Sequence, residues 1–223
     1  MKEPSIAFYF AIYHEWKLAS RLIKQVRNFY PDTPIIAIAD GTFDSEFAVL
    51  SKSYNITFIQ GKRLKLLEYG GKWWERAFIA FLELTTADIL IKLDPDTCIW
   101  RKFNYYPDTD WFGTIEHNML HPFPRGGCKG LQSSAIEKII SSKLLESSQF
   151  KHKFYEYDRF GKFKYPHESI PKIALGNEDL ILSEIGYRLK FSLANWTEIN
   201  IQLRKAPLIK NFAATHPHPY IEK

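Results

Sequence analysis

The chain has 223 residues and a formal net charge of +5, from 30 Lys and Arg against 25 Asp and Glu. Its composition of 45% hydrophobic and 25% charged residues excludes wholesale disorder and fits one domain with a sizeable core. No apolar run approaches the roughly 20 residues of a membrane-spanning helix, and two cysteines are too few for a disulfide framework. We therefore expect a soluble cytoplasmic protein, with peripheral membrane contact left open, whose mild positive charge suits an anionic ligand and indicates no nucleic acid.

Strand and helix patterns alternate through the first hundred residues. Apolar runs predict four strands, and apolar residues at helical spacing predict three helices between them. In chain order these are strand 5–12, helix 15–29, strand 34–39, helix 44–52, strand 55–59, helix 73–84 and strand 88–93. Such alternation predicts an α/β fold, with a mostly parallel, Rossmann-like sheet flanked by helices.

The second half of the chain is less regular. Its patterns predict a strand over 111–115, a helix over 131–145, a helix over 178–187 and a strand over 189–193. Residues 147–171 are polar, basic and aromatic without a clear period, which indicates an irregular loop or small subdomain. We expect one domain over 1–223.

Two of the predicted strands are followed at once by an aspartate. Asp40 comes after strand 34–39, and Asp94 comes after strand 88–93. Because ligands of parallel sheets bind at the carboxyl ends of the strands, both residues are candidates for ligand binding.

The strand before Asp94 leads into an Asp-x-Asp motif, Asp94-Pro95-Asp96. Carboxylates at i and i+2 on extended backbone project to the same side, and such a pair can hold a hard divalent cation. An Asp-Pro turn without a ligand is the competing interpretation. A second copy, Asp108-Thr109-Asp110, has no buried strand before it and is interpreted as a surface turn. The role of Lys92 is left open.

The Asp-x-Asp strand and its surroundings resemble the nucleotide-sugar-dependent glycosyltransferases of the GT-A fold. Asp40-Gly41-Thr42 is similar to the Asp-Gly-Ser element that this family places against the nucleotide base and ribose. The family often has a basic donor-binding residue on the helix before the Asp-x-Asp strand. The donor-binding candidates are Ala11, Tyr13, Asp40, Lys72, Arg76, Asp94 and Gly127.

Three later segments extend the resemblance. The run from Gly126 to Gly130 looks like the family's glycine-rich segment beside the donor sugar and acceptor, although a tight turn before a helix is an equal alternative. Glu178-Asp179 resembles its Glu-Asp element at the start of a late helix. His216 resembles the C-terminal histidine that completes the metal site in many members, with His218 the less favoured alternative.

This resemblance implies a metal site and a catalytic base. Asp94, Asp96 and His216 are the predicted ligands of Mn²⁺ or Mg²⁺, and the imidazole nitrogen makes manganese more natural than calcium. The metal would neutralise the charge that develops on a leaving diphosphate. Asp179 is the candidate base for the acceptor hydroxyl, with Glu178 less favoured; stabilisation of acids by the first turn of a helix is the competing account.

We therefore predict a metal-dependent glycosyltransferase of the GT-A type, inverting, with UDP-sugar favoured as donor. Residues 1–100 would form a nucleotide-binding half and 101–223 an acceptor-binding half that includes 147–171. The acceptor is left open between a glycan, a lipid-linked molecule and a small molecule. The alternatives are a nucleotidyltransferase, disfavoured because no glycine-rich loop follows the first strand, and a nucleotide-sugar-binding module without transfer activity.

Overall fold

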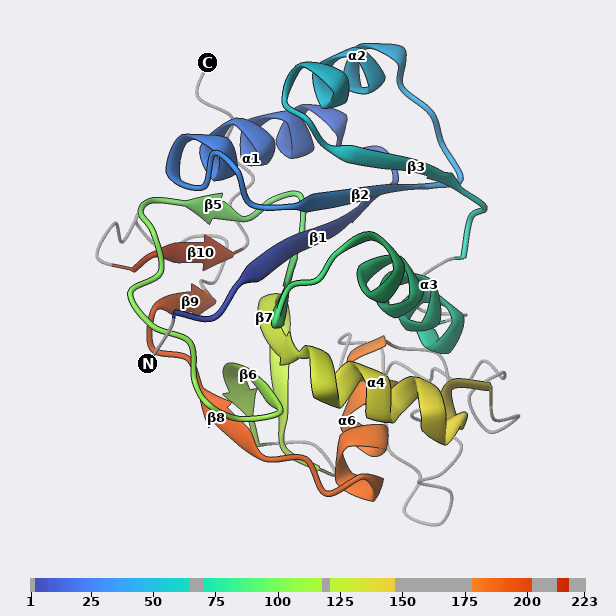
Figure 1. Ribbon diagram of the computed structural model, residues 1–223, viewed down its shortest axis with the longest axis vertical. Helices are drawn as coiled ribbons and strands as arrows, with labels where there is room; N and C mark the ends of the chain where they lie inside the picture. The colour runs from blue at the N-terminus through green and yellow to red at the C-terminus, as the bar shows by residue number, and fades with distance from the viewer. Residues whose placement is uncertain (1–2, 65–69, 118–120, 147–177, 202–211, 217–223) are drawn as a thin grey trace, which may run out of the picture.

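The computed structural model describes residues 3–64, 70–117, 121–146, 178–201 and 212–216 (Figure 1). Its first half alternates strand and helix as the sequence predicts. The elements of this half are β1 (Ile6–Ile12), α1 (Trp16–Phe29), β2 (Ile35–Asp40), α2 (Ser45–Ser53), β3 (Thr57–Gly61), α3 (Gly70–Leu84) and β4 (Ile89–Leu93). Each corresponds to a predicted strand or helix, with bounds that differ by a few residues.

A seven-stranded sheet forms the centre of the molecule, in the order β3-β2-β1-β4-β7-β6-β8. Its later strands are β6 (Trp111–Glu116), β7 (Phe123–Gln132) and β8 (Leu193–Asn195). β7 is antiparallel to its neighbours β4 and β6, and the other pairings in this sheet are parallel. The predicted α/β class with a mostly parallel sheet is confirmed.

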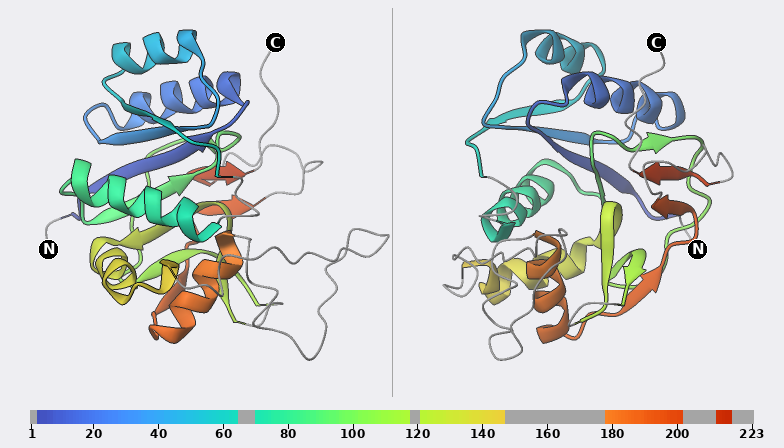
Figure 2. Two further views of the ribbon diagram at one scale, coloured as in Figure 1. Left: turned by 90° about the vertical axis from the view of Figure 1, so that its right-hand side faces the viewer. Right: turned by 180° about the vertical axis from the view of Figure 1, so that it is seen from behind.

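Helices cover both faces of this sheet (Figures 1 and 2). α1 and α2 lie on one face, and α3 lies on the other with α4 (Ser133–Ser142) and α6 (Glu178–Arg188). Alternate residues of β1 supply the two cores, since Phe8 packs on the α1 side and Tyr9 on the α3 side. Burial of both faces explains why the parallel strands are almost continuously apolar.

A second, three-stranded sheet has the order β5-β10-β9. Its strands are short, namely β5 (Cys98–Ile99), β9 (Ile199–Ile201) and β10 (Ala214–His216). It lies next to α1, where the Gln25 side chain accepts a hydrogen bond of 3.1 Å from the Ile99 N–H. The sheet joins the segment after the Asp-x-Asp motif to residues far along the chain.

Several predictions for the second half are wrong in detail. The predicted helix 131–145 begins only at Ser133, because the two residues before it end β7, and the short 3₁₀ helix η1 (Leu144–Glu146) follows it. The predicted strand 189–193 is displaced to β8. The glycine-rich run 126–130 lies inside β7 and not in a turn before a helix. The predicted loop 147–171 and His218 lie outside the described residues.

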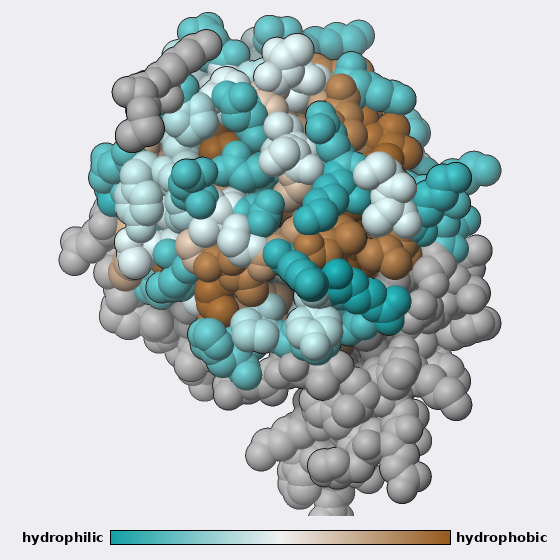
Figure 3. Space-filling model, turned by 60° about the horizontal axis from the view of Figure 1, so that its bottom comes forward, coloured by the Kyte–Doolittle hydropathy of each residue, from teal (hydrophilic) through white to brown (hydrophobic). Residues whose placement is uncertain are grey.

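Among the coloured, described residues on the face drawn in Figure 3, hydrophobic side chains form groups bounded by hydrophilic ones. Among the described helices, none is both long and apolar enough to cross a membrane.

Candidate active site

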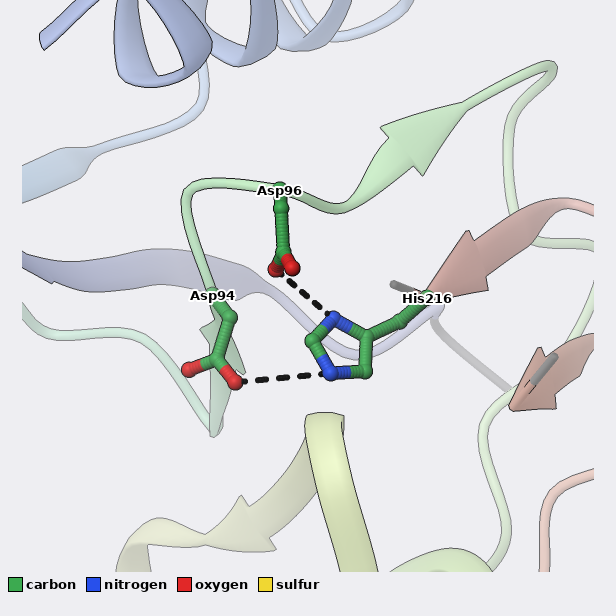
Figure 4. A group of neighbouring side chains, drawn as sticks. All are labelled: Asp94, Asp96 and His216. Atoms are coloured by element: carbon green, nitrogen blue, oxygen red, sulfur yellow. Dashed lines mark ion pairs between the residues drawn. The ribbon is translucent and has the colours of Figure 1, made fainter. Parts of the chain in front are cut away.

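Asp94 and Asp96 lie in a turn at the carboxyl end of β4. The Asp94 carbonyl accepts a hydrogen bond of 2.9 Å from the Thr97 N–H, which places Pro95 at the second position of a β-turn. Proline favours this position because its φ is fixed near the required value. The expectation of extended backbone is therefore wrong, yet both carboxylates still point toward one place (Figure 4).

His216 of β10 completes this group of side chains. Its Nδ1 lies 3.0 Å from Asp96 Oδ1, and its Nε2 lies 3.6 Å from Asp94 Oδ2 (Figure 4). One ligand atom from each of the three residues lies within 4.8 Å of the others. The register of the small sheet explains the approach, since β10 pairs with β5, which follows the Asp-x-Asp turn directly.

Gly127 of β7 borders the same cluster. Its carbonyl accepts a hydrogen bond of 2.7 Å from the Asp94 N–H. A Cβ at this position would lie 2.5 Å from Asp94 Oδ2 and 2.4 Å from His216 Nδ1. The close approach of Asp94 and His216 to the backbone of β7 therefore depends on glycine. Two carboxylates and an imidazole that converge against a glycine backbone fit a divalent metal.

Gly127→Ala tests whether this close approach serves metal binding. The fold is expected to survive, because the atoms that clash belong to side chains. Manganese affinity is expected to fall roughly 10- to 100-fold, as it does when groups that orient metal ligands are altered. Isothermal titration with MnCl₂ measures the change. Gly186→Ala in α6 is the control, because a Cβ there meets Trp111 at an ordinary 3.5 Å. Unchanged affinity in Gly127→Ala would contradict the assignment.

The buried Lys92 of β4, whose role was left open, faces the same cluster. Its Nζ lies 2.5 Å from Asp94 Oδ1. Burial works to raise the pKa of Asp94, but the charges of Lys92 and His216 outweigh it and lower that pKa to about 2. For Lys92, burial works to lower the pKa, and the charges of Asp94 and the acids of α6 raise it above its usual value. Both groups therefore stay charged.

Glu178 and Asp179 begin α6, as predicted. Asp179 Oδ1 is ion-paired with the Nζ of Lys129, and Oδ2 accepts a hydrogen bond of 3.4 Å from the Gly126 N–H. Asp179 thus lies against the residue next to Gly127. Glu178 is only 7% exposed. Its burial, with the charge of Asp179, raises the pKa of Glu178 to about 7, although Lys92 and Lys129 lower it in part.

Asp40 and Arg76 bind each other at the end of β2. Asp40 Oδ1 lies 3.0 Å from Arg76 Nη2, and Oδ2 lies 2.8 Å from Arg63 Nη1. The Leu64 N–H also donates to Oδ1, and Asp40 is 3% exposed. Arg63 was not among the predicted site residues, because a single arginine in a loop gives no periodic or motif signal. Both oxygens of the Asp40 carboxylate are engaged within the protein.

The remaining donor-binding candidates lie around β1 and α3. The Tyr13 ring lies beneath Arg63, whose guanidinium carbon is 3.2 Å from the ring centroid. Ala11 is half-buried in β1 and pairs with Ile38 of β2. Lys72 is exposed on α3, where with Arg76 it lines a groove of about 510 Å³ beside β2 and β3. The structure thus brings together the metal candidates, Gly127 and the acids of α6, and forms a second group around Asp40.

The sequence matches no protein-family model and no curated protein. Among solved structures, the chain is similar to galactosyltransferase LgtC in complex with donor and acceptor sugar analogs, with a TM-score of 0.56 at 14% identity, covering 94% of this chain and 86% of LgtC. It is also similar to the apo form of the glycosyltransferase GlyE from Streptococcus pneumoniae TIGR4, with a TM-score of 0.52 at 12% identity. That match covers 85% of this chain and 45% of GlyE, so the chain spans less than half of GlyE. The fold is that of the GT-A glycosyltransferases.

Proposed function

We propose that this protein is a metal-dependent glycosyltransferase, which moves a sugar from a nucleoside-diphosphate sugar to a hydroxyl acceptor. The observation that carries this proposal is the convergence of Asp94, Asp96 and His216 beside Gly127 at the carboxyl end of β4. The GT-A fold supports it, and so does the presence of donor and acceptor sugar analogs in the similar structure of LgtC. UDP remains the favoured nucleotide, and the acceptor remains a glycan, a lipid-linked molecule or a small molecule. Cytoplasmic localisation stays a sequence-based prediction.

Asp94, Asp96 and His216 would hold Mn²⁺ or Mg²⁺. When bound, such an ion supplies a Lewis acid for the negative charge that develops on a leaving diphosphate. Gly127 would let the backbone of β7 lie directly against these ligands, since a side chain there would clash with Asp94 and His216. The net charge of +5 suits a ligand with several negative charges.

Asp179 is our candidate base. In an inverting reaction the acceptor oxygen forms a bond to the anomeric carbon while the bond from that carbon to the diphosphate oxygen breaks. The electron pair of the broken bond stays with the diphosphate, and the acceptor proton passes to the carboxylate. The contact of Asp179 with Gly126 supports this role. Glu178 has a pKa of about 7, which suits a base at neutral pH, but it is more deeply buried.

Thermal unfolding in the presence of MnCl₂ and a panel of nucleoside diphosphates tests the proposal. A metal-dependent rise in melting temperature is expected for one nucleotide. At a ligand concentration of 100 Kd the stabilisation is about 2.7 kcal/mol. No response to any nucleotide, with or without manganese, would overturn the proposal. Hydrolysis of a panel of nucleotide sugars without an acceptor then identifies the donor.

Two other functions give different results in the same assays. A binding module without transfer activity would respond in the thermal assay but would neither hydrolyse nor transfer any donor. A nucleotidyltransferase would release pyrophosphate from a nucleoside triphosphate and a sugar phosphate. The residues that follow β1, from Tyr13 onward, contain no glycine-rich loop for a triphosphate, which makes the nucleotidyltransferase the weaker alternative.

A further inference from the structure

Two buried lysines lie directly opposite each other in the antiparallel pair β4 and β7. Lys92 and Lys129 are cross-strand partners in this ladder, and their side chains are 2% and 0% exposed. Like charges directly opposite each other destabilise a sheet, and a buried ammonium group needs a partner of opposite charge. The pair therefore requires carboxylates close by.

Each lysine binds a different carboxylate of the candidate site. Lys92 Nζ lies 2.5 Å from Asp94 Oδ1, whereas Lys129 is ion-paired with Asp179 Oδ1. The ammonium group of Lys92 also lies 5.7 Å from the ring centroid of Trp73, and that of Lys129 lies 5.9 Å from the ring centroid of Trp74, the next residue of α3. The same helix thus covers both lysines and keeps their ammonium groups away from water.

The contacts of Asp179 show how firmly β7 fixes its position. Oδ1 is bound by the side chain of Lys129, and Oδ2 accepts a hydrogen bond from the Gly126 N–H, so β7 contacts both oxygens. Glu178 directly precedes Asp179 in α6, and its backbone carbonyl accepts a hydrogen bond of 2.9 Å from Trp74 Nε1. The first turn of α6 is therefore anchored on β7 through Asp179 and on α3 through its backbone.

We infer that Lys92 and Lys129 are positioning residues with separate tasks, in which Lys92 holds Asp94 for metal binding and Lys129 holds Asp179 for proton transfer. The inference rests on the proposed function. It assigns the two members of one cross-strand pair to two different steps, although their burial and chemical type are the same. A purely structural pair would give no such division.

Lys92→Met and Lys129→Met form a matched pair of variants, because each removes a buried charge and keeps most of the side-chain volume. Lys92→Met is expected to raise the Kd for Mn²⁺ by roughly 10-fold or more, since the ammonium group that holds the candidate ligand Asp94 is lost. Lys129→Met is expected to leave that Kd within about threefold and to lower kcat roughly 100-fold through misplacement of the base, with the donor KM unchanged. Isothermal titration with MnCl₂ and steady-state transfer kinetics measure these effects.

A double variant separates positioning from general damage. If Lys129 acts only through Asp179, adding Lys129→Met to Asp179→Asn is expected to change kcat by less than about twofold, because contacting residues are not additive. If Lys129→Met alone does not fold, this double variant still tests the inference, since it leaves neither charge buried alone. For Lys92, the charge-retaining Lys92→Arg is expected to restore manganese affinity in part.

The inference would be overturned if the two methionine variants had equal effects on metal affinity and on kcat. It would also be overturned if adding Lys129→Met to Asp179→Asn lowered kcat by the full factor that Lys129→Met causes alone. The wild-type protein distinguishes this failure from that of the proposed function. A wild-type protein without metal-dependent nucleotide binding and without transfer overturns the proposed function and the inference with it. An active wild-type protein whose lysine variants behave alike overturns only the inference.

Discussion

Asp96→Ala is expected to abolish the manganese-dependent stabilisation by a nucleoside diphosphate and to reduce sugar transfer to background. The variant removes one of three candidate ligands, the one whose Oδ1 lies 3.0 Å from His216 Nδ1. The loss of metal affinity is expected to exceed the roughly 10- to 100-fold loss that follows when a residue hydrogen-bonded to a metal ligand is altered. The Asp96 side chain is 28% exposed, so its loss leaves no deeply buried charge behind and the fold is expected to remain. Thermal unfolding with and without MnCl₂ measures the effect.

The second Asp-x-Asp sequence provides the control for this variant. Asp108 is exposed, and Asp108→Ala is expected to bind manganese and nucleotide as the wild-type protein does. Asp110 is unsuitable, because its Oδ2 accepts hydrogen bonds of 2.8 Å and 2.7 Å from the N–H and hydroxyl of Ser192. If Asp96→Ala keeps the full response to manganese, Asp96 is not a metal ligand.

Asp179→Asn is expected to lower kcat by roughly 10²- to 10⁴-fold, the range that general bases contribute, while nucleotide binding persists. The amide keeps the shape of the carboxylate and an oxygen that can accept from Lys129, but it cannot take the acceptor proton. Transfer kinetics give kcat and KM, and NMR coupling constants of the product give its anomeric configuration. Inversion is the expected outcome.

Glu178→Gln is the matched control for the base. It changes the neighbouring acid of α6 in the same way and is expected to cost much less in kcat. If Glu178→Gln causes the larger loss instead, Glu178 is the base and Asp179 serves to position it. If Asp179→Asn loses nucleotide binding together with transfer, its role is structural.

The parallel half of the sheet was predictable, because strands that are buried on both faces carry nearly continuous apolar residues. β2 illustrates this, since all six of its residues are buried and five are apolar. The candidate metal ligands Asp94 and Asp96 were predictable for a related reason. Polar residues that follow a buried strand directly lie at the carboxyl edge of the sheet, where ligands bind.

β7 was not predictable from local pattern, because its sequence contains three glycines, an arginine and a lysine. Lys129 is nevertheless fully buried, and its charge is balanced by Asp179 of α6. This partner is distant in the sequence, so no window around Lys129 reveals it. The same holds for Arg63, because its ion pair with Asp40 forms between residues that are distant in the sequence and become neighbours only in the folded protein.

The Asp-Pro turn and the metal site were treated as alternatives, but the structure contains a turn whose carboxylates also converge. The turn bends the chain from β4 into β5, and β5 then aligns β10 and His216 with the two aspartates. A strand of two residues has no recognisable period. The three candidate ligands were therefore predictable from the sequence, whereas the small sheet that brings them together was not.

This small sheet has a consequence for the lifetime of the site. β5, β9 and β10 have two, three and three residues, and short strands with few hydrogen bonds open at a lower free energy than long buried ones. When β10 opens locally, the His216 imidazole leaves the two aspartates while the seven-stranded sheet stays closed. If Asp94, Asp96 and His216 hold a metal ion as proposed, its residence time is expected to follow the fraying of β10, which hydrogen–deuterium exchange of the β10 amides measures.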